Sequence, residues 1–550
     1  MSNRLREALG RGEFVVTVET IPGRGANEAA QLREIEEAER IYAGGRVHAI
    51  SITDNPGGNP ALLADAVAEE LHEKGITTLL HFTCKDRNRN QMQSQLYALQ
   101  RRGMENLLVM SGDYVQSGWG GRPRPVFDLD PIHTLQMIQD MNTGLTQATP
   151  RGDAREVPAS FFPGAVVSPF KWTEGETVTQ YLKLEKKIAG GARFVVSQLG
   201  YDARKMEELM AYLRARGYGT PVIANVYLLT AGAARYMSEG NVPGAYVGEG
   251  LLTTLRDEAK ATDKGLGARC LRAAKMIAVA RGLGYAGVHI GGTGLTSEIV
   301  GQVLDDAEEM QGRWREWAEE IAHGRPGGFY LYRQTDDGKD GTRALGAPLP
   351  SPPAEAPHDR RIFRGYGVSR FFHYWVLTKG KRGFRLLMRV MDRRERKKGP
   401  HRHHGLEHLG KTALYGCVDC GDCGLESAGY SCPMAQCPKC QRNGPCGGSK
   451  DGWCEVYPQE RFCIHFKAYY RLRKHGELSK LDRCITPPNN WELFETSAWS
   501  NYTHGRDNAA HRQYLPPQGE RARPGGRRGG DADGAKDKDG TQGPRQDAPQ

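Results

Sequence analysis

The sequence predicts an α/β protein, namely a (β/α)8 TIM barrel that is followed by a cysteine-rich metal-binding domain and a disordered tail. Residues 1–325 alternate short apolar runs with helical patterns, which favours a parallel sheet closed into a barrel. Ten of the twelve cysteines lie between Cys417 and Cys484. From residue 516 onward the chain has almost no apolar side chains and cannot build a core.

Eight short apolar or β-branched runs are the candidate strands of the barrel. They are Phe14–Thr20, Val47–Asp54, Ile76–Cys84, Asn106–Asp113, Ala165–Pro169, Arg193–Leu199, Pro221–Leu229 and Ala286–Gly292. Eight β/α units in about 300 residues fit a barrel better than an open sheet. A doubly wound sheet remains the alternative, because strand counts from a single sequence are error-prone.

Helix punctuation separates several of these runs. Asn59 and Pro60 suit the N-cap and first position of a helix, and Gly75 suits its end. We therefore expect a barrel over 1–325, a proline-rich linker over 326–357, the cysteine-rich domain over 358–515 and a disordered tail over 516–550.

The cysteine spacing in the second domain predicts metal binding. Short C-x₂-C loops bring two sulfurs onto one metal centre, and such clusters bind metal more often than they form disulfides in a reducing cytosol. The candidate ligands are Cys417, Cys420, Cys423, Cys432, Cys437, Cys440, Cys446, Cys454 and Cys463. Eight of these nine thiols suffice for two four-coordinate centres. Both zinc and a [4Fe–4S] cluster fit the pattern.

Charge and hydropathy limit the partners. No apolar run is long enough to span a bilayer, and the N-terminus lacks the apolar core of a secretory signal, so we expect a cytoplasmic protein. The net charge of +10 is concentrated in residues 359–404, which hold 15 lysines and arginines against 3 acids. We expect the aromatic residues of this segment to pack the second domain onto the barrel, while its cations face solvent. This disfavours nucleic-acid binding.

Polar side chains cluster at the ends of the predicted strands, where TIM barrels place their active sites. Glu19 and Thr20 end the first strand, Thr53 and Asp54 the second, residues 81–84 the third, Gly112 and Asp113 the fourth, and Gln198 the sixth. Two carboxylates, an imidazole and an amide in these positions suit acid–base chemistry on a polar heterocycle.

Several of these blocks together resemble the methylenetetrahydrofolate reductase family. The resemblance is carried by Phe14-Val-Val-Thr-Val-Glu-Thr-Ile-Pro22, by His81-Phe-Thr-Cys-Lys-Asp-Arg-Asn88 with the Gly103–Asp113 block, and by Lys187–Ala192 leading to Val196–Asp202. It covers roughly residues 1–300, in order. The run Asn443-Gly-Pro-Cys-Gly-Gly-Ser449 is similar to the C-terminal domain that is fused to some of these reductases.

The resemblance implies flavin-dependent reduction of 5,10-methylenetetrahydrofolate to 5-methyltetrahydrofolate in one-carbon and methionine metabolism. The hydride would come from NAD(P)H or another donor, with FAD favoured over FMN. Glu19 would be the general acid, which requires a pKa raised toward neutrality. Asp113 would be the second catalytic residue, because its carboxylate can hydrogen-bond the pterin and favour the cationic iminium. Glu19, Asp113 and Gln198 would bind the pterin. The residues expected to bind the flavin are Thr53, His81, Ser111, Gly112, Asp113 and Lys187.

Some positions depart from the family pattern. Ser111 stands where bacterial reductases commonly have arginine, and an arginine expected after the eighth strand is replaced by Gly291-Gly292-Thr293. These departures leave the dinucleotide half of the flavin site and the electron donor open. We expect a homo-oligomer, with an electron-donor protein as a possible partner. The alternatives are a pterin-dependent methyltransferase barrel working with a metal or corrinoid partner, and a zinc-containing nucleic-acid binder.

Overall fold

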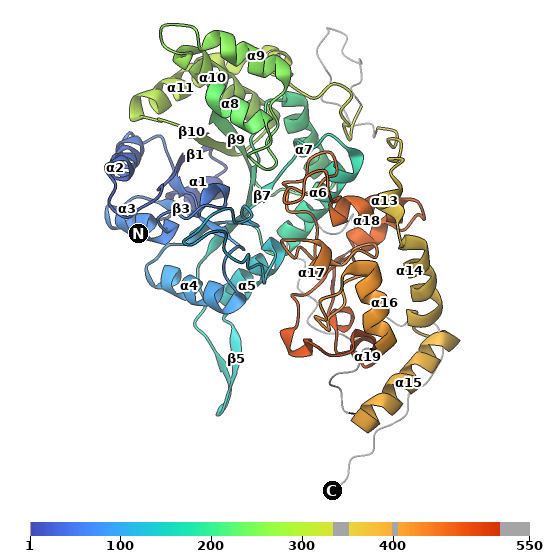
Figure 1. Cartoon of the computed structure of the whole chain (residues 1–550). Helices are drawn as coiled ribbons and strands as arrows, with labels where there is room; N and C mark the ends of the chain where they lie inside the picture. The colour runs from blue at the N-terminus through green and yellow to red at the C-terminus, as the bar shows by residue number, and fades with distance from the viewer. Residues whose placement is uncertain (1, 334–350, 399–404, 517–550) are drawn as a thin grey trace.

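The structure, a computed structural model, describes residues 2–333, 351–398 and 405–516. Eight parallel strands close into a barrel in which the first strand pairs with both the second and the last, so the predicted fold is confirmed (Figure 1). All eight predicted runs are barrel strands. In order around the barrel they are β1 (Val15–Thr20), β2 (Ala49–Ile52), β3 (Thr78–Thr83), β4 (Asn106–Met110), β7 (Phe162–Val167), β8 (Phe194–Ser197), β9 (Val222–Leu228) and β10 (Gly287–Gly292).

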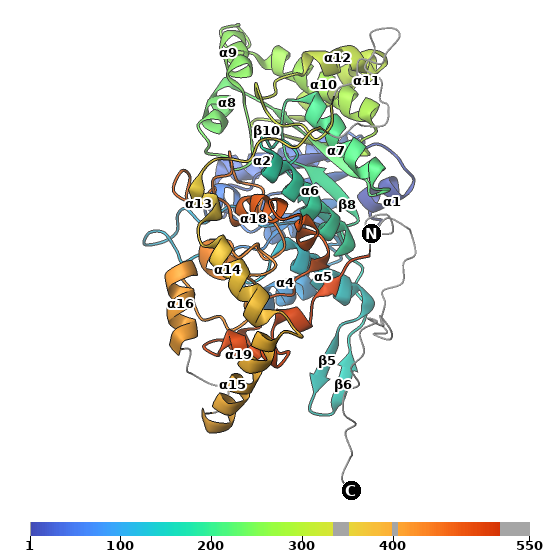
Figure 2. The same ribbon diagram turned by 90° about the vertical axis from the view of Figure 1, so that its right-hand side faces the viewer.

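Helices follow the strands and cover the outside of the barrel (Figures 1 and 2). They are α1 (Arg4–Gly10), α2 (Ala29–Ala43), α3 (Ala64–Glu73), α4 (Arg89–Arg101), α5 (Pro131–Thr143), α6 (Glu174–Ala189), α7 (Ala203–Ala215), α8 (Ala231–Ser238), α9 (Glu249–Glu258), α10 (Leu266–Leu283), α11 (Ser297–Met310) and α12 (Trp314–Glu320), with short turns η1 (Pro56–Gly58) and η2 (Gln311–Arg313). An exposed hairpin, β5 (Thr146–Thr149) and β6 (Gly152–Arg155), projects from the barrel and was not predicted.

The start of α3 differs from the prediction. The helix begins at Ala64 with Leu63 in the N-cap position, and not at Asn59. The Asn59 side chain instead accepts a hydrogen bond of 2.7 Å from the Ser117 hydroxyl in the loop after β4. A side chain that is engaged across two loops cannot cap its own helix, so the loop after β2 extends further than its sequence indicates.

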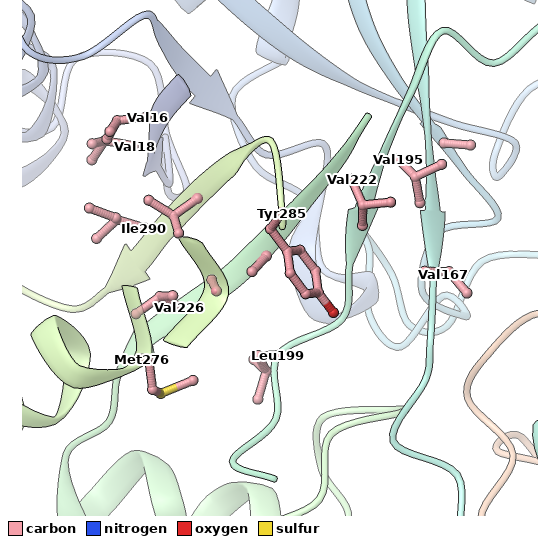
Figure 3. Close-up of a cluster of buried hydrophobic side chains, with 14 of the residues drawn as sticks. Val16, Val18, Val167, Val195, Leu199, Val222, Val226, Met276, Tyr285 and Ile290 are labelled. Carbon is pink, nitrogen blue, oxygen red and sulfur yellow. The ribbon is translucent and has the colours of Figure 1, made fainter. Parts of the chain in front are cut away.

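Apolar side chains pack on both surfaces of the barrel wall. Inside the barrel, α1 contributes Leu5 and Ala8 to a buried layer that also contains Leu79 and Phe194. Outside, the strands pack against the helices in a larger core, part of which Figure 3 shows around Tyr285. Because side chains alternate along a strand, the apolar layer fixes which residues further along each strand also face inward.

The cysteine-rich unit is made of short helices and loops beside the barrel (Figure 1). Its elements are α13 (Arg360–Phe363), α14 (Tyr366–Phe372), the π-helix η3 (His373–Leu377), α15 (Arg382–Lys398), α16 (Gly405–Tyr415), α17 (Pro433–Gln436), α18 (Ile464–Arg473), η4 (Leu478–Leu481), β11 (Cys484–Ile485), η5 (Trp491–Leu493), α19 (Ala498–Thr503), η6 (Asn508–Ala510) and β12 (Gln513–Tyr514). The predicted disordered tail lies almost entirely outside the described residues, as does much of the predicted linker.

Helix α18 joins this unit to barrel helix α6. The Tyr469 hydroxyl donates to Glu174 over 2.6 Å, and the backbone N–H of Gly175 donates to the Tyr470 hydroxyl over 3.3 Å. A Cβ atom at position 175 would lie only 2.7 Å from the Tyr470 ring, so glycine permits this close approach. The aromatic residues of the basic segment contribute unequally to the junction. Phe371 is 67% and Trp375 53% exposed, whereas Phe363 packs on the buried cluster of α18 that Val178 and Leu182 of α6 also contact. The packing prediction is therefore wrong for Phe371 and Trp375 but not for Phe363.

A buried carboxylate also ties the two units together. Asp130 caps α5 and accepts hydrogen bonds from the backbone and the side chain of Asn443, at 3.1 and 3.0 Å. Burial raises the pKa of Asp130, but the charges of His133 and Lys183 and the hydrogen bond from Asn443 outweigh burial, so the pKa lies well below its usual value. The folded state therefore favours the ionised form.

Asp130→Asn should destabilise the protein by about 3–5 kcal/mol, because it removes a buried negative charge that interacts favourably with the buried side chains of His133 and Lys183. Denaturant unfolding at pH 7 measures this difference. A carboxyl group whose pKa is lowered by folding stabilises the folded protein at pH values above its unfolded pKa of about 3.9, and this stabilisation is lost as the pH falls toward the folded pKa. The difference in the free energy of unfolding between wild type and variant should therefore become smaller below about pH 4. Equal stability at pH 7 would contradict this role.

No helix among the described residues is long and apolar enough to cross a membrane.

Candidate active site

Three ionisable side chains meet inside the carboxyl half of the barrel. One ligand atom from each of Glu19, His81 and His289 lies within 4.8 Å of the other two. The Glu19 carboxylate is 3.5 Å from His289 Nε2 and keeps 18% of its surface exposed, whereas His289 is 2% exposed. Glu19 and His81 are thus the partly exposed members of the group, and His289 is its buried member.

The strand register explains why these residues meet. Thr17 is paired with His289 across β1 and β10, and His289 is paired with Asn225 across β9. The Thr17 hydroxyl is 2.9 Å from His289 Nδ1, and the Ser51 hydroxyl is 2.9 Å from His81 Nε2. Each imidazole is therefore oriented by a hydroxyl, which leaves its other nitrogen for the interior of the site.

The protonation of the group differs from the sequence expectation. Burial raises the pKa of Glu19, but the hydrogen bond and charge of His289 and the charge of His81 outweigh burial and leave that pKa below its usual value. Burial lowers the pKa of His81 to about 4. Glu19 is accordingly a carboxylate at neutral pH in the protein without ligands, and the predicted raised pKa is not a property of this state.

Asp113 and Thr53 occupy neighbouring loops at the strand ends. The Asp113 carboxylate accepts a hydrogen bond of 2.8 Å from the backbone N–H of Gly57. Thr53 is buried, and its hydroxyl is without a hydrogen-bond partner among the described residues. The neighbouring Asp54 carboxylate accepts a hydrogen bond of 2.7 Å from the Thr83 hydroxyl and forms an ion pair with Arg87. Asp113 and Thr53 therefore keep acceptor and donor capacity for a ligand, while Asp54 is engaged in the protein.

Gln198 lies where the second unit meets the barrel. Its side-chain oxygen accepts from the N–H of Leu199 over 2.8 Å. A Cβ atom at Gly244 would come within 3.5 Å of the Gln198 amide nitrogen and within 2.9 Å of the Gly447 carbonyl. The loop that contains Cys446 thus approaches the amide from the cysteine-rich side.

Three of the predicted cofactor contacts are engaged by the protein itself. The Ser111 hydroxyl donates to the Gln441 side chain over 3.2 Å, and Lys439 donates to the Gly112 carbonyl over 2.7 Å. Lys187 is 6% exposed and donates to the Val166 carbonyl, and burial lowers its pKa to about 7. The polar groups of these three residues are therefore already engaged with protein groups in the structure without ligands.

Two buried polar atoms that have no hydrogen-bond partner among the described residues come from the barrel strands. They are Thr53 Oγ1, just after β2, and Asn225 Oδ1, within β9. Ser168 Oγ and Gln180 Nε2 are also without a partner among the described residues, but these two side chains lie against Gly447 of the cysteine-rich unit. Native proteins rarely leave buried polar groups unpaired.

The first four cysteines of the second unit form one group. Burial raises the pKa of Cys420 and Cys432 to about 12 each, with the neighbouring Cys423 as the next cause for both. Burial and Cys423 also raise the pKa of Cys417. These mutual effects show that the four thiols lie close together, and they line one small cavity.

The other five thiols form a second group, with Cys446 at its centre. Burial raises the pKa of Cys437 and Cys463, and for both the Cys446 thiol is the next cause. Cys454 raises the pKa of Cys446 and Cys463. Within this group Cys440 raises the pKa of Cys437 alone, and no other thiol shifts the pKa of Cys440 itself. Cys440 is therefore the peripheral member.

The thiol spacing bears on which metal fits. All twelve cysteines are free thiols, and in the described part of the chain no three of their sulfurs lie within 4.8 Å of one another. Four sulfurs at about 2.3 Å from one zinc ion would be about 3.8 Å apart. Four thiolates from such a group can also hold a [4Fe–4S] cluster, in which several iron atoms separate the sulfurs of the protein.

Sequence reasoning missed His289, Ser51 and Asn225. The strand-end residues were considered, but these three lie deeper in the barrel. The sequence did contain a signal for His289. Because side chains alternate along a strand, Thr17 and Glu19 of β1 face the same side. A histidine in the middle of an apolar strand, such as His289, is then a candidate for the same interior layer.

The fold and this site define a (β/α)8-barrel protein with an acid–base group at the carboxyl ends of its strands, joined to a thiol-rich unit. A sequence profile of "Methylenetetrahydrofolate reductase" matches residues 4–290, and one of "Methylene-tetrahydrofolate reductase C terminal" matches residues 399–492. The chain belongs to the methylenetetrahydrofolate reductase family, a family of oxidoreductases.

Individual relatives are distant. The chain is 23% identical over 234 residues to a probable methylenetetrahydrofolate reductase (NADPH) of Caenorhabditis elegans, covering 41% of this chain and 32% of that protein. It is 23% identical over 235 residues to a probable methylenetetrahydrofolate reductase (NADH) of Oryza sativa subsp. japonica, covering 40% and 36%. The chain thus spans about a third of the length of these curated relatives.

Among solved structures, an uncharacterized protein from Clostridium thermocellum that binds two copies of 5-methyl-5,6,7,8-tetrahydrofolic acid aligns with 56% of this chain and 99% of its own. The identity is 12% and the TM-score 0.40.

Proposed function

We propose that this chain reduces 5,10-methylenetetrahydrofolate to 5-methyltetrahydrofolate with a flavin bound at the barrel mouth. The observation that carries the proposal is the partly exposed Glu19 carboxylate held beside two oriented imidazoles, in a barrel of this family. Family membership favours this reaction over the methyltransferase alternative.

Glu19 is the residue positioned to handle the proton. The folate ring opens when its departing nitrogen is protonated, so the acid must sit next to that nitrogen. The pKa of Glu19 is low without ligands, and a ligand ring covering the carboxylate would remove more water from it and raise that pKa. His289, 3.5 Å away and hydrogen-bonded to Thr17, can return a proton to Glu19.

His289→Asn should raise the pKa of Glu19, because it removes the hydrogen bond and charge that hold that pKa down. An acid must be protonated to act, so the rate falls as pH rises through its pKa, and a raised pKa moves this fall to higher pH. The pH dependence of folate reduction measures the shift. Profiles of wild type and variant that superimpose would show that His289 does not set the protonation of Glu19.

The mouth fits the ring system of a flavin better than its phosphate tail. The hydroxyl of Thr53 and the amide oxygen of Asn225 are without a hydrogen-bond partner among the described residues, and the Asp113 carboxylate keeps acceptor capacity beyond the Gly57 N–H. A bound flavin would supply the hydride for the folate. Lys187, Ser111 and Gly112 are engaged with protein groups, so we do not place the phosphates on them.

The two thiol groups are arranged in series toward the barrel. Cys432 and Cys437 are separated only by α17, so the groups adjoin each other. Lys439 and Gln441, which lie beside the second group, contact Gly112 and Ser111 at the mouth. We propose [4Fe–4S] clusters in both groups, which would carry single electrons from an external donor, with direct reduction by NAD(P)H as the other route.

The test is an anaerobic assay of the purified chain with reduced viologen as the electron donor. We expect 5-methyltetrahydrofolate to form over many turnovers, by a protein with a flavin absorbance band and about eight iron atoms per chain, two clusters of four. A protein that contains iron and flavin but leaves the folate unchanged would refute the proposed reaction, and zinc in place of iron would refute the clusters alone.

A further inference from the structure

One surface of the cysteine-rich unit carries a strongly basic helix. Helix α15 lies on the side of that unit that is remote from the barrel (Figures 1 and 2). Residues 382–397 of this helix include seven lysines and arginines against two acids. All seven cations are exposed, and none of them forms an ion pair with another described residue. The helix therefore presents a large positive charge to solvent.

The two acids of α15 do not reduce this charge at the surface, because they face the interior of the unit. The Asp392 carboxylate lies 3.0 Å from His504 Nε2, and Glu395 forms an ion pair with Arg506. The apolar side chain of Met391 on the same side of the helix is also buried. One face of α15 thus packs on α19, and the opposite face carries the cations.

Exposed aromatic side chains adjoin this basic face. Phe371 of α14 and Tyr374 and Trp375 of η3 are 67%, 53% and 53% exposed. The ring centroids of Phe371 and Trp375 are 6.3 Å apart and those of Tyr374 and Trp375 are 5.4 Å apart, so the three rings form one patch. A Cβ atom at Gly383 of α15 would lie 2.2 Å from the Trp375 carbonyl oxygen, which brings the patch against the basic helix. Exposed aromatic side chains bordered by arginines are typical of protein–protein contact surfaces.

The aromatic patch lies next to the first thiol group. Phe372 and His373, which alternate with the residues of the patch, line a cavity that Cys423 also lines. Cys423 belongs to the first thiol group, which is the outer one in the proposed series of centres that leads to the barrel. The outer centre and the basic, aromatic surface are therefore on the same side of the molecule.

We propose that α15 and the aromatic patch form the docking surface for an acidic protein that carries single electrons. This role rests on the proposed function, in which such a donor reduces the first centre. Each carrier is oxidised by one electron, and two electrons with two protons from solvent convert one molecule of the folate.

The charge of the surface disfavours a second copy of this chain as its occupant. In a symmetric dimer the same patch meets itself, so the cations of the two α15 helices would face each other and repel. Nucleic acid would match the charge, but the position beside the first thiol group favours an electron carrier.

The probe is a plant-type [2Fe–2S] ferredoxin, an acidic carrier of low potential. Oxidised ferredoxin is titrated into the full chain by calorimetry, at low salt and at about 1 M salt, where the Debye length falls to about 3 Å. We expect binding at low salt that weakens at least about tenfold at high salt. Cytochrome c, a basic single-electron carrier, should not bind.

The double variant Arg389→Glu with Arg393→Glu should bind ferredoxin at least about tenfold more weakly at low salt, because its outer face loses positive charge and gains negative charge. Trp375→Ala should weaken binding by a similar factor, since an exposed aromatic side chain at the centre of an interface contributes much of the affinity. The matched control is Arg33→Glu with Arg151→Glu, two exposed arginines of α2 and of the β5–β6 turn. It changes the net charge equally and should keep the wild-type affinity, and all variants should keep their metal content.

Folate reduction distinguishes docking from the barrel chemistry. Reduced viologen is a small donor that needs no docking surface, so it should drive the double variant of α15 as fast as wild type, whereas the rate with reduced ferredoxin should fall at least about tenfold. Equal ferredoxin affinity in wild type and in the α15 variant would overturn the inference. Binding of a duplex DNA oligonucleotide in place of ferredoxin, lost in the same variant, would overturn it in favour of nucleic acid. A wild type that binds ferredoxin but reduces no folate with viologen would refute the proposed reaction and not the docking surface.

Discussion

Glu19→Gln is expected to slow folate reduction by about 10²- to 10⁴-fold, the usual contribution of a positioned acid, while the donor still reduces the flavin at its normal rate. Glutamine keeps the size of the side chain and a hydrogen bond toward His289, 3.5 Å away, but cannot give up a proton. The two half-reactions separate these effects. Anaerobic stopped-flow measurements follow flavin reduction by the donor and flavin reoxidation by the folate.

The control for Glu19→Gln is Glu13→Gln, just before the same strand. Glu13 pairs with Arg11 on the surface at the opposite end of β1, so its charge can be removed without touching the site. The control should retain both half-reactions. Equal loss of both half-reactions in Glu19→Gln would show that Glu19 supports the cofactor or the fold and is not the acid.

Cys446→Ser should remove one of the two proposed metal centres and destabilise the unit that would hold it. The Cys446 thiol raises the pKa of Cys437 and of Cys463, and Cys454 in turn raises the pKa of Cys446. Cys446 is therefore central to the second thiol group. Structural metal sites contribute on the order of 10 kcal/mol to folding. We therefore expect the metal content to fall by half and thermal unfolding of the second unit to occur well below that of wild type.

Cys440→Ser is the matched comparison. Among the thiols of this group, Cys440 raises the pKa of Cys437 alone. We therefore expect Cys440 to be the one of the nine cysteines that does not bind metal. Its variant should keep both centres and the wild-type melting temperature. Loss of metal in Cys440→Ser with retention in Cys446→Ser would reverse the assignment of the ligands.

Much of the fold could be predicted because the apolar pattern of each strand is a local property of the sequence. Eight β-branched runs gave all eight barrel strands, since buried parallel strands are nearly continuous apolar segments. The β5–β6 hairpin could not be predicted in this way, because its residues are exposed and polar. The start of α3 was predicted wrongly because the Asn59 side chain forms a hydrogen bond with Ser117, which is distant in sequence.

The site was predictable in part for a related reason. Glu19, Thr53, His81 and Asp113 stand at strand ends, where position along the chain indicates position in space. The low pKa of Glu19 in the protein without ligands was not foreseen, because it depends on His289, whose approach is fixed only when β10 closes against β1. The covering of Ser111 by Gln441 depends on how the two units pack, which no local pattern reports.

A single-turnover experiment tests most directly whether the barrel holds an acid–base site for folate reduction. The chain with its flavin fully reduced is mixed anaerobically with 5,10-methylenetetrahydrofolate at pH 7, and flavin absorbance and folate products are followed together. We predict flavin oxidation with one equivalent of 5-methyltetrahydrofolate per flavin. Persistently reduced flavin and unchanged folate, in protein that binds both, would contradict the account.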